Sequence, residues 1–236
     1  MTACELTLDG APLTLTHLDN AYDRPVRVKI PPAAFERVDE GRAWVEALAA
    51  RGEPIYGINT GFGHLKNKQV PTEQIDRLQE NLILSHAVGV GPAVPPQVAR
   101  WMLLLKIQAL LAGHSGVRRD VIRQLQICLN ADILPVIPTR GSLGASGDLA
   151  PLAHMVLALM GRGMMSVPTG PARERRREDR PAAEMLQAVA LEPLRLVAKE
   201  GLALINGTQM MAAYAANIAV RARRLADLAD LIACMS

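Results

Sequence analysis

A glycine-rich loop near the middle of the chain carries the residues best suited to chemistry. Residues 139–151 have the sequence Thr-Arg-Gly-Ser-Leu-Gly-Ala-Ser-Gly-Asp-Leu-Ala-Pro, and the apolar run that follows, 152–160, predicts a helix. Three glycines within seven residues give the backbone freedom that an ordinary turn does not need. Pro151 suits the first turn of a helix, and Ser146 or Asp148 could cap its free amides. The partial positive charge of such a helix start would stabilise an electron-rich group nearby.

The residue types of this loop allow several interpretations. A tight turn before a capped helix requires only the glycines and Pro151. A phosphate-binding loop would need a Lys-Ser/Thr pair at the Walker spacing, which is absent. A hydrolase nucleophile elbow around Ser146 would need glycine at the position of Asp148. The spacing alone leaves both a plain turn and a chemical role open.

Three further segments place polar side chains among glycines or apolar residues. The first, residues 55–63, is rich in glycine and includes Tyr56. In the second, His86 ends an apolar helical pattern, and in the third, Asn206 precedes a glycine. Each has a plain structural interpretation: Tyr56 as a half-buried aromatic, His86 as a core histidine, and Asn206 as a turn or cap residue. No one of these segments is specific by itself.

Together with the loop, these segments resemble the aromatic amino acid ammonia-lyases. The triplet Ala145-Ser146-Gly147, between Gly-Ser-Leu-Gly and Asp-Leu-Ala-Pro-Leu-Ala-His, is similar to that family's self-processing loop, and the matches run in the family's order from Tyr56 to Gln209. The resemblance implies that the triplet cyclises to a methylidene-imidazolone. The amide nitrogen of Gly147 would attack the carbonyl of Ala145, and Ser146 would lose its hydroxyl as water. The resemblance also implies no external cofactor and no metal.

The same resemblance implies roles for the other matching residues. Tyr56 is expected to remove the substrate's β-proton, and Asn206 to hold the electrophile's oxygen or the substrate amine. The pair Ser85-His86 is similar to the pair in histidine-selective members, where a polar ring can hydrogen-bond an imidazole. The implied reaction is the non-oxidative deamination of L-histidine to urocanate and ammonia. A lyase or aminomutase acting on another aromatic amino acid is the close alternative, and the Ser85-His86 pair argues against it.

Composition and periodicity predict a mainly α protein with a few short strands. Half of the 236 residues are hydrophobic but only 3% are aromatic, which favours packed helices. Alternating leucines (Leu6, Leu8, Leu13, Leu15) around an Asp9-Gly10 turn predict short strands at the N-terminus. We expect a globular N-terminal domain over 1–200 that carries the electrophile loop, and the start of a long-helix bundle over 201–236. Helical spacing predicts helices at 33–50, 71–87, 97–112, 117–129, 152–160, 182–191 and 209–235.

Charge and cysteine patterns exclude several classes of partner. The net charge is +3, and residues 173–180 hold five arginines against three acidic residues, which predicts a solvated loop and not a nucleic-acid surface. Charged residues interrupt the apolar C-terminal segment, so we expect no membrane span. The scattered Cys4, Cys128 and Cys234 lack metal-ligand spacing and predict a reducing, cytoplasmic location. His114 and His154 are expected to be structural, because no nucleophile or metal ligand is spaced with either.

The resemblance also implies partner chains. Family members are longer than this chain, and their remaining part supplies an arginine for the substrate carboxylate, a further tyrosine and a glutamate. Their active sites are assembled from several subunits of a tetramer. The helix over 209–235 runs to Ser236 without a stop signal. We therefore expect a homo-oligomer or a second chain that supplies the missing half, with a non-catalytic or split fragment as the alternative.

Overall fold

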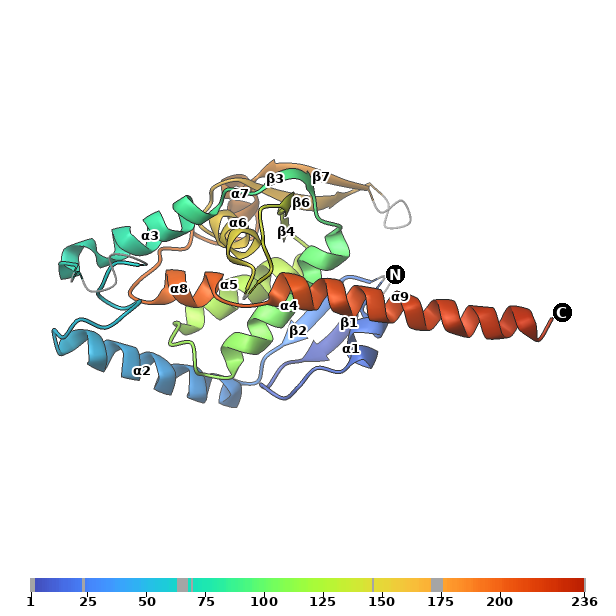
Figure 1. Ribbon diagram of the computed structural model, residues 1–236, viewed down its shortest axis with the longest axis horizontal. Coiled ribbons are helices and arrows are strands. Elements are labelled where there is room, and N and C mark those ends of the chain that lie inside the picture. The colour runs from blue at the N-terminus through green and yellow to red at the C-terminus, as the bar shows by residue number, and fades with distance from the viewer. Residues whose placement is uncertain are drawn as a thin grey trace.

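The computed structural model describes residues 3–22, 24–62, 68, 70–145, 147–170 and 176–235. The described chain is mainly α-helical with short strands, which confirms the expected fold class (Figure 1). The helices are α1 (Leu15–Asn20), α2 (Glu36–Ala50), α3 (Ile75–His86), α4 (Pro96–Leu111), α5 (Arg119–Asn130), α6 (Leu149–Leu159), α7 (Ala182–Ala188), α8 (Glu200–Ile205) and α9 (Gln209–Ala233). The strands are β1 (Cys4–Thr7), β2 (Val26–Lys29), β3 (Val90–Ala93), β4 (Leu134–Pro135), β5 (Pro138–Arg140), β6 (Met164–Thr169) and β7 (Arg176–Pro181). Single 3-10 turns, Pro32–Phe35 and Thr72–Gln74, lead into α2 and α3.

Helix α4 forms the centre of the hydrophobic core. Its sequence is apolar on almost every side, and a helix of this kind has to be buried on all its faces. Trp101, Met102 and Leu104 on α4 have no exposed surface. Helices α9 and α5 pack along α4, and α6 joins the same core through Leu152 and Met155. The expected helices therefore enclose a single core, from which the loops that carry the candidate site emerge.

The N-terminal segment differs from its predicted strand pair. Strands β1 and β2 pair in parallel, and α1 lies in the connection between them. The Thr14 hydroxyl accepts from the backbone N–H of His17, whose ring accepts from the backbone N–H of Thr14. This capping box starts a helix at Leu15, so the hairpin expected through Leu13 and Leu15 does not form. The prediction was wrong because leucine alternation is a weaker local signal than a two-way cap.

The charged run also differs from its prediction, over the part that the structure describes. Strand β7 pairs antiparallel with β6 along its whole length, so these residues are not a solvated loop. The Arg177 guanidinium donates to Asp132 Oδ2 at 2.7 Å, and the same carboxylate binds Arg100. This partly buried arginine pair could not be inferred from charge density, because Asp132 lies 45 residues earlier in the chain. Residues 173–175 of the run lie outside the described residues.

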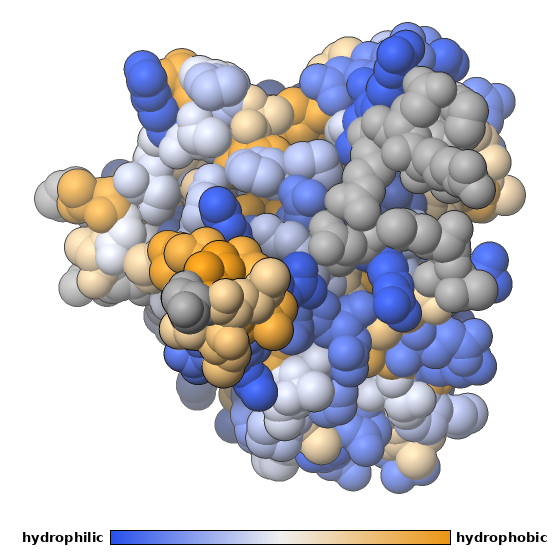
Figure 2. All heavy atoms as spheres, turned by 90° about the vertical axis from the view of Figure 1, so that its right-hand side faces the viewer, coloured by the Kyte–Doolittle hydropathy of each residue, from blue (hydrophilic) through white to orange (hydrophobic). Residues whose placement is uncertain are grey.

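Helix α9 extends far beyond the body of the molecule (Figure 1). Val220 is its last buried residue, and every described residue from 221 onward is exposed. Figure 2 views this end and shows hydrophobic side chains gathered on the protruding helix. Among the described helices, none combines the length and the hydropathy that crossing a membrane requires. The proposed division of the chain at residue 200 stays a prediction. The exposed large apolar residues of this end are Leu225, Leu228, Leu231, Ile232 and Met235.

Candidate active site

The glycine-rich loop connects β5 to α6 and makes close backbone contact with the chain just before α9. Gly147 has a φ of +157°, and a Cβ added there would lie 3.0 Å from the carbonyl oxygen of Gly207. Only glycine fits this approach without displacing backbone. The next residue strengthens the contact, since the backbone N–H of Asp148 donates to the same Gly207 oxygen at 2.8 Å. The structure thus brings Gly147 of the predicted electrophile to the turn that contains Asn206. Ser146 lies outside the described residues.

Asp148 has a different role from the one predicted. It occupies the N-cap position of α6, but its side chain makes no cap hydrogen bond there. Its Oδ2 instead accepts from the backbone N–H of Met211, in the first turn of α9, at 3.0 Å, and its Oδ1 accepts from the Ser142 hydroxyl at 3.4 Å. A carboxylate at the N-terminus of a helix is stabilised by unpaired amides and by the helix dipole. The buried Asp148 therefore caps α9 and fixes the electrophile loop to it.

Tyr56 lies in a loop that packs against α8. The side chain of Asn59 holds the loop by accepting from one backbone N–H and donating to one backbone carbonyl, both at 2.7 Å. The Tyr56 ring meets Phe62 edge-on with centroids 5.9 Å apart, and 53% of Tyr56 is exposed. A Cβ added to Gly57 would stand 2.3 Å from the Leu202 side chain. The tyrosine loop is thus in direct contact with the helix that leads to Asn206.

His86 is fixed at the C-terminus of α3. Its Nδ1 lies 2.8 Å from the carbonyl oxygen of Leu82 and 3.1 Å from the Ser85 hydroxyl. A carbonyl oxygen can only accept, so a neutral His86 assigned from this contact carries its proton on Nδ1. Its Nε2 is then an acceptor, and no described residue binds it. This half-buried ring can accept a hydrogen bond from an N–H group of a ligand.

A short ribbon connects the end of α3 to the electrophile loop. Strand β3 pairs antiparallel with β5, the strand that enters the loop. At the start of the ribbon, the backbone N–H of Gly89 donates to His154 Nε2 on α6 at 2.9 Å. Burial lowers the pKa of His154, which favours the neutral ring that can accept this bond. The histidine expected to be structural therefore links α6, behind the electrophile loop, to the segment that follows His86.

Sequence reasoning missed one buried polar residue beside the site. Lys106 on α4 is 1% exposed, and its Nζ donates to the carbonyl oxygens of Ala203 at 3.0 Å and Asn206 at 3.1 Å. Burial lowers the pKa of Lys106 to about 7. The sequence places this lysine between apolar residues, Leu103–Leu105 and Ile107, but the carbonyls it binds are about a hundred residues away.

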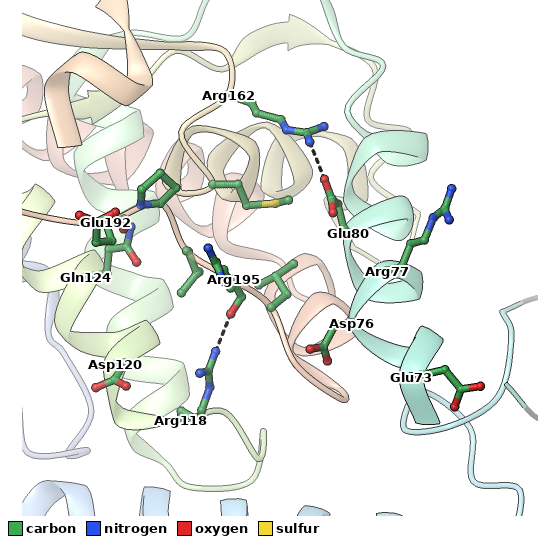
Figure 3. Close-up of a pocket in the computed structure, with 14 residues that line it drawn as sticks. Glu73, Asp76, Arg77, Glu80, Arg118, Asp120, Gln124, Arg162, Glu192 and Arg195 are labelled. Atoms are coloured by element: carbon green, nitrogen blue, oxygen red, sulfur yellow. Dashed lines mark hydrogen bonds and ion pairs between the residues drawn. The ribbon is translucent and has the colours of Figure 1, made fainter. Parts of the chain in front are cut away.

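An open cavity lies away from these residues. It has a volume of about 960 Å³ and is bordered by α3, α5 and the segment before α8. Figure 3 shows that charged side chains of both signs surround it, with Arg162 paired to Glu80. None of the predicted site residues lines this cavity. No group of side chains suited to holding a metal ion occurs among the described residues.

Comparison with known proteins assigns the family. A family model described as aromatic amino acid lyase matches residues 13–236. The chain belongs to the aromatic amino acid lyase family. Relatives of this lyase domain include histidine ammonia-lyase from Burkholderia cenocepacia, 48% identical over 210 residues, which are 89% of this chain and 40% of the relative. Histidine ammonia-lyase from Gloeobacter violaceus is 47% identical over 231 residues, 98% of this chain and 43% of the relative.

Solved structures with the same fold include several members of this lyase family. Histidine ammonia-lyase from Trypanosoma cruzi has a TM-score of 0.85 and 37% identity, and the match covers 96% of this chain and 43% of that one. Phenylalanine aminomutase from Pantoea agglomerans also has a TM-score of 0.85, with 30% identity over 96% of this chain and 42% of that one. The lyase chain described here spans about two-fifths of the length of the relatives it matches.

Proposed function

We propose that this chain is the part of a histidine ammonia-lyase that carries the electrophile, and that it takes part in converting L-histidine to urocanate and ammonia. The observation that carries the proposal is the contact between the Ala145–Gly147 loop and the Asn206–Gly207 turn, bonded through Asp148. Relatives named histidine ammonia-lyase at 47–48% identity favour histidine over other aromatic amino acids. The six proposed site residues are Tyr56, His86, Ala145, Ser146, Gly147 and Asn206.

The residues of the loop fit a self-formed methylidene-imidazolone. Ala145 and Gly147 are the smallest residue types available, and a side chain at Gly147 would have to displace the Gly207 carbonyl. Ser146 between them would lose its hydroxyl as water, and closure of the ring would release a second water. When formed, this group would supply an electrophilic carbon for the substrate amine without any external cofactor.

The proposed roles of the other residues follow from their positions. The half-exposed phenol of Tyr56 is accessible to a substrate and would take its β-proton. The side chain of Asn206, an exposed residue, can donate to an oxygen or accept from an amine. His86 Nε2 would accept the imidazole N–H of L-histidine. The N-terminus of α6 places partial positive charge behind the loop, where electron density would accumulate.

Intact mass spectrometry of the purified chain tests the electrophile directly. We expect a mass two waters below the encoded value. Ser146→Ala is the matched control, because it removes only the hydroxyl and should retain the encoded mass. A wild-type chain at its full encoded mass would refute self-processing, and the non-catalytic fragment would then be the better interpretation.

A urocanate assay tests the substrate. We expect L-histidine to be deaminated in preference to L-tyrosine and L-phenylalanine, with the chain alone or combined with the remaining part of the enzyme. His86→Phe should reverse this preference because it removes the acceptor for the imidazole N–H. Deamination of L-tyrosine in preference to L-histidine by the wild type would refute the substrate assignment.

We also propose that the exposed end of α9 packs against helices of other chains in a homo-oligomer, a tetramer by family resemblance, or of a chain that supplies the missing half. Leu225, Leu228, Ile232 and Met235 follow the three-four spacing of a helix-packing seam, and all are exposed. An exposed apolar surface of this kind is typical of an interaction site. Light scattering should give a mass above that of the monomer, and Leu228→Glu should reduce it.

The cysteines support a cytoplasmic location, which remains part of this proposal. Cys4, Cys128 and Cys234 are all free. Burial raises the pKa of the Cys128 thiol to about 12, so this thiol is inert toward oxidation. Free cysteines of this kind are typical of a reducing compartment.

A further inference from the structure

Lys106 is a buried cation without an anionic partner. It lies in the middle of α4, the central helix of the core, and among the described residues no carboxylate forms an ion pair with it. Its only hydrogen bonds to described residues go to the carbonyl oxygens of Ala203 and Asn206. Both carbonyls lie at the C-terminal end of α8, where a helix leaves its last carbonyls without intrahelical partners. Lys106 therefore caps α8 from inside the core.

An apolar residue would suit the packing at this position better than lysine does. Removing an ammonium group from water is costly, and the lowered pKa of Lys106 reflects that cost. A methionine has a similar length and would fill the same space in the core without this cost. What lysine alone adds here is the pair of hydrogen bonds to α8 and Asn206. The role of Lys106 is therefore to hold those two carbonyls in position.

The two carbonyls of the Asn206–Gly207 turn are held from different sides. The Asn206 carbonyl accepts from Lys106, and the Gly207 carbonyl accepts from the backbone N–H of Asp148 beside the electrophile loop. At Asn206 the chain leaves the helix with φ −77° and ψ 120°, and this residue is exposed. Fixing both carbonyls restrains the two successive peptide planes that follow Asn206 and Gly207, and with them the backbone from which the Asn206 side chain extends.

We propose that Lys106 is a positioning residue that holds the Asn206–Gly207 turn against the electrophile loop. The expected effect on catalysis rests on the proposed function, whereas the contact between Lys106 and the Asn206–Gly207 turn does not. A displacement of about 1 Å in a reacting group can reduce a rate a hundredfold. Loss of the Lys106 bonds would release the turn toward solvent and loosen the contact that keeps Gly147 near Gly207. Formation of the electrophile and the deamination rate would both fall.

Hydrogen exchange tests the contact independently of any chemistry. The reporter is the amide of Asp148, which donates to Gly207, and the variant is Lys106→Met. We expect this amide to exchange at least about tenfold faster in the variant, the change that the loss of ordinary hydrogen bonds produces. Arg100→Met is the matched control, because it also removes a buried cation from α4 but leaves the Asn206 turn untouched. Unchanged protection of Asp148 in Lys106→Met would overturn the proposal.

A second measurement separates positioning from simple stabilisation. We expect Lys106→Met to keep a thermal midpoint at or above that of the wild type at pH 7, while the rate of two-water loss falls at least about tenfold. In complete enzyme, kcat should fall by a larger factor than KM rises, because fewer molecules carry a formed electrophile while the His86 contact to the substrate remains. A parallel loss of stability and processing would overturn the positioning role. If the wild type itself loses no water, the proposed function fails, and the exchange measurement still decides the role of Lys106.

Discussion

The buried carboxylate of Glu200 allows a quantitative test of how α8 is held in place. Glu200 is 0% exposed, and its oxygens accept from Arg118 through the backbone N–H at 3.0 Å, Nε at 2.9 Å and Nη2 at 2.8 Å. The Val197 backbone N–H donates a fourth bond at 3.1 Å. The bond to Glu200 in turn raises the pKa of Arg118. Because α8 starts at Glu200 and ends just before Asn206, this pair anchors the helix that carries a proposed site residue.

Arg118→Met leaves this carboxylate in the core with backbone donors only. Breaking a buried pair on one side costs about 3–5 kcal/mol. In a chain of this size 1 kcal/mol lowers Tm by about 2–4 °C, so we expect a decrease of about 6–20 °C by calorimetry. The matched control is Arg162→Met, whose partner Glu80 lies 2.6 Å away on the surface, with both side chains more than a third exposed (Figure 3). That substitution should cost at most about 1 kcal/mol.

The double variant Arg118→Met/Glu200→Met completes the test. Replacing both members of a buried pair by apolar residues is often neutral, because no uncompensated charge remains. We expect it to recover most of the stability lost in Arg118→Met. The reasoning is refuted if Arg118→Met and Arg162→Met lower Tm equally, or if the double variant is less stable than Arg118→Met alone.

Three further predictions concern individual residues near the site. Burial in the folded chain lowers the pKa of Lys106 from 10.5 to about 7. Between these two pH values, Lys106 holds its proton in the unfolded chain but not in the folded chain. The free energy of unfolding should therefore rise with pH across that range, by about 1.4 kcal/mol per unit, in wild type but not in Lys106→Met, as measured by urea titration. The pKa of His154 is lowered from 6.5 in the folded chain. The neutral ring therefore contributes fully to the free energy of unfolding above pH 6.5, and this contribution is lost as the pH falls through the folded pKa. In the same titration, His154→Gln should not show this loss of stability at acid pH. Gly207 has a φ of +154° and little room beside the Gln209 side chain. Gly207→Ala should therefore destabilise the chain by about 1–3 kcal/mol and stop two-water loss, as measured by mass spectrometry. The control is Gly52→Ala, at φ +73° with nothing within contact distance of an added Cβ, which should leave two-water loss intact.

Much of the fold could be predicted because its signals are local. The apolar spacing of α2, α3, α4 and α9 lies within each helix, and the structure confirms all four. The N-terminal segment failed because the alternating leucines and the Thr14 cap predict different structures, and the cap prevails. Most of the described charged run is exposed, as predicted, but it is a strand and not a loop. The loop prediction failed because pairing with β6 and the bond from Arg177 to Asp132 depend on other parts of the chain.

The sequence by itself determined which residues could form the electrophile and the order of the segments around it. That information lies in short motifs, since the triplet at 145–147 and the residues flanking it are contiguous. Tertiary structure alone decided what holds those segments together. The bond from Met211 to Asp148 spans 63 residues, and the bond from Lys106 to Asn206 spans 100. The sequence does not show which residues such contacts join, because this depends on which surfaces of α4, α8 and α9 meet when the core packs.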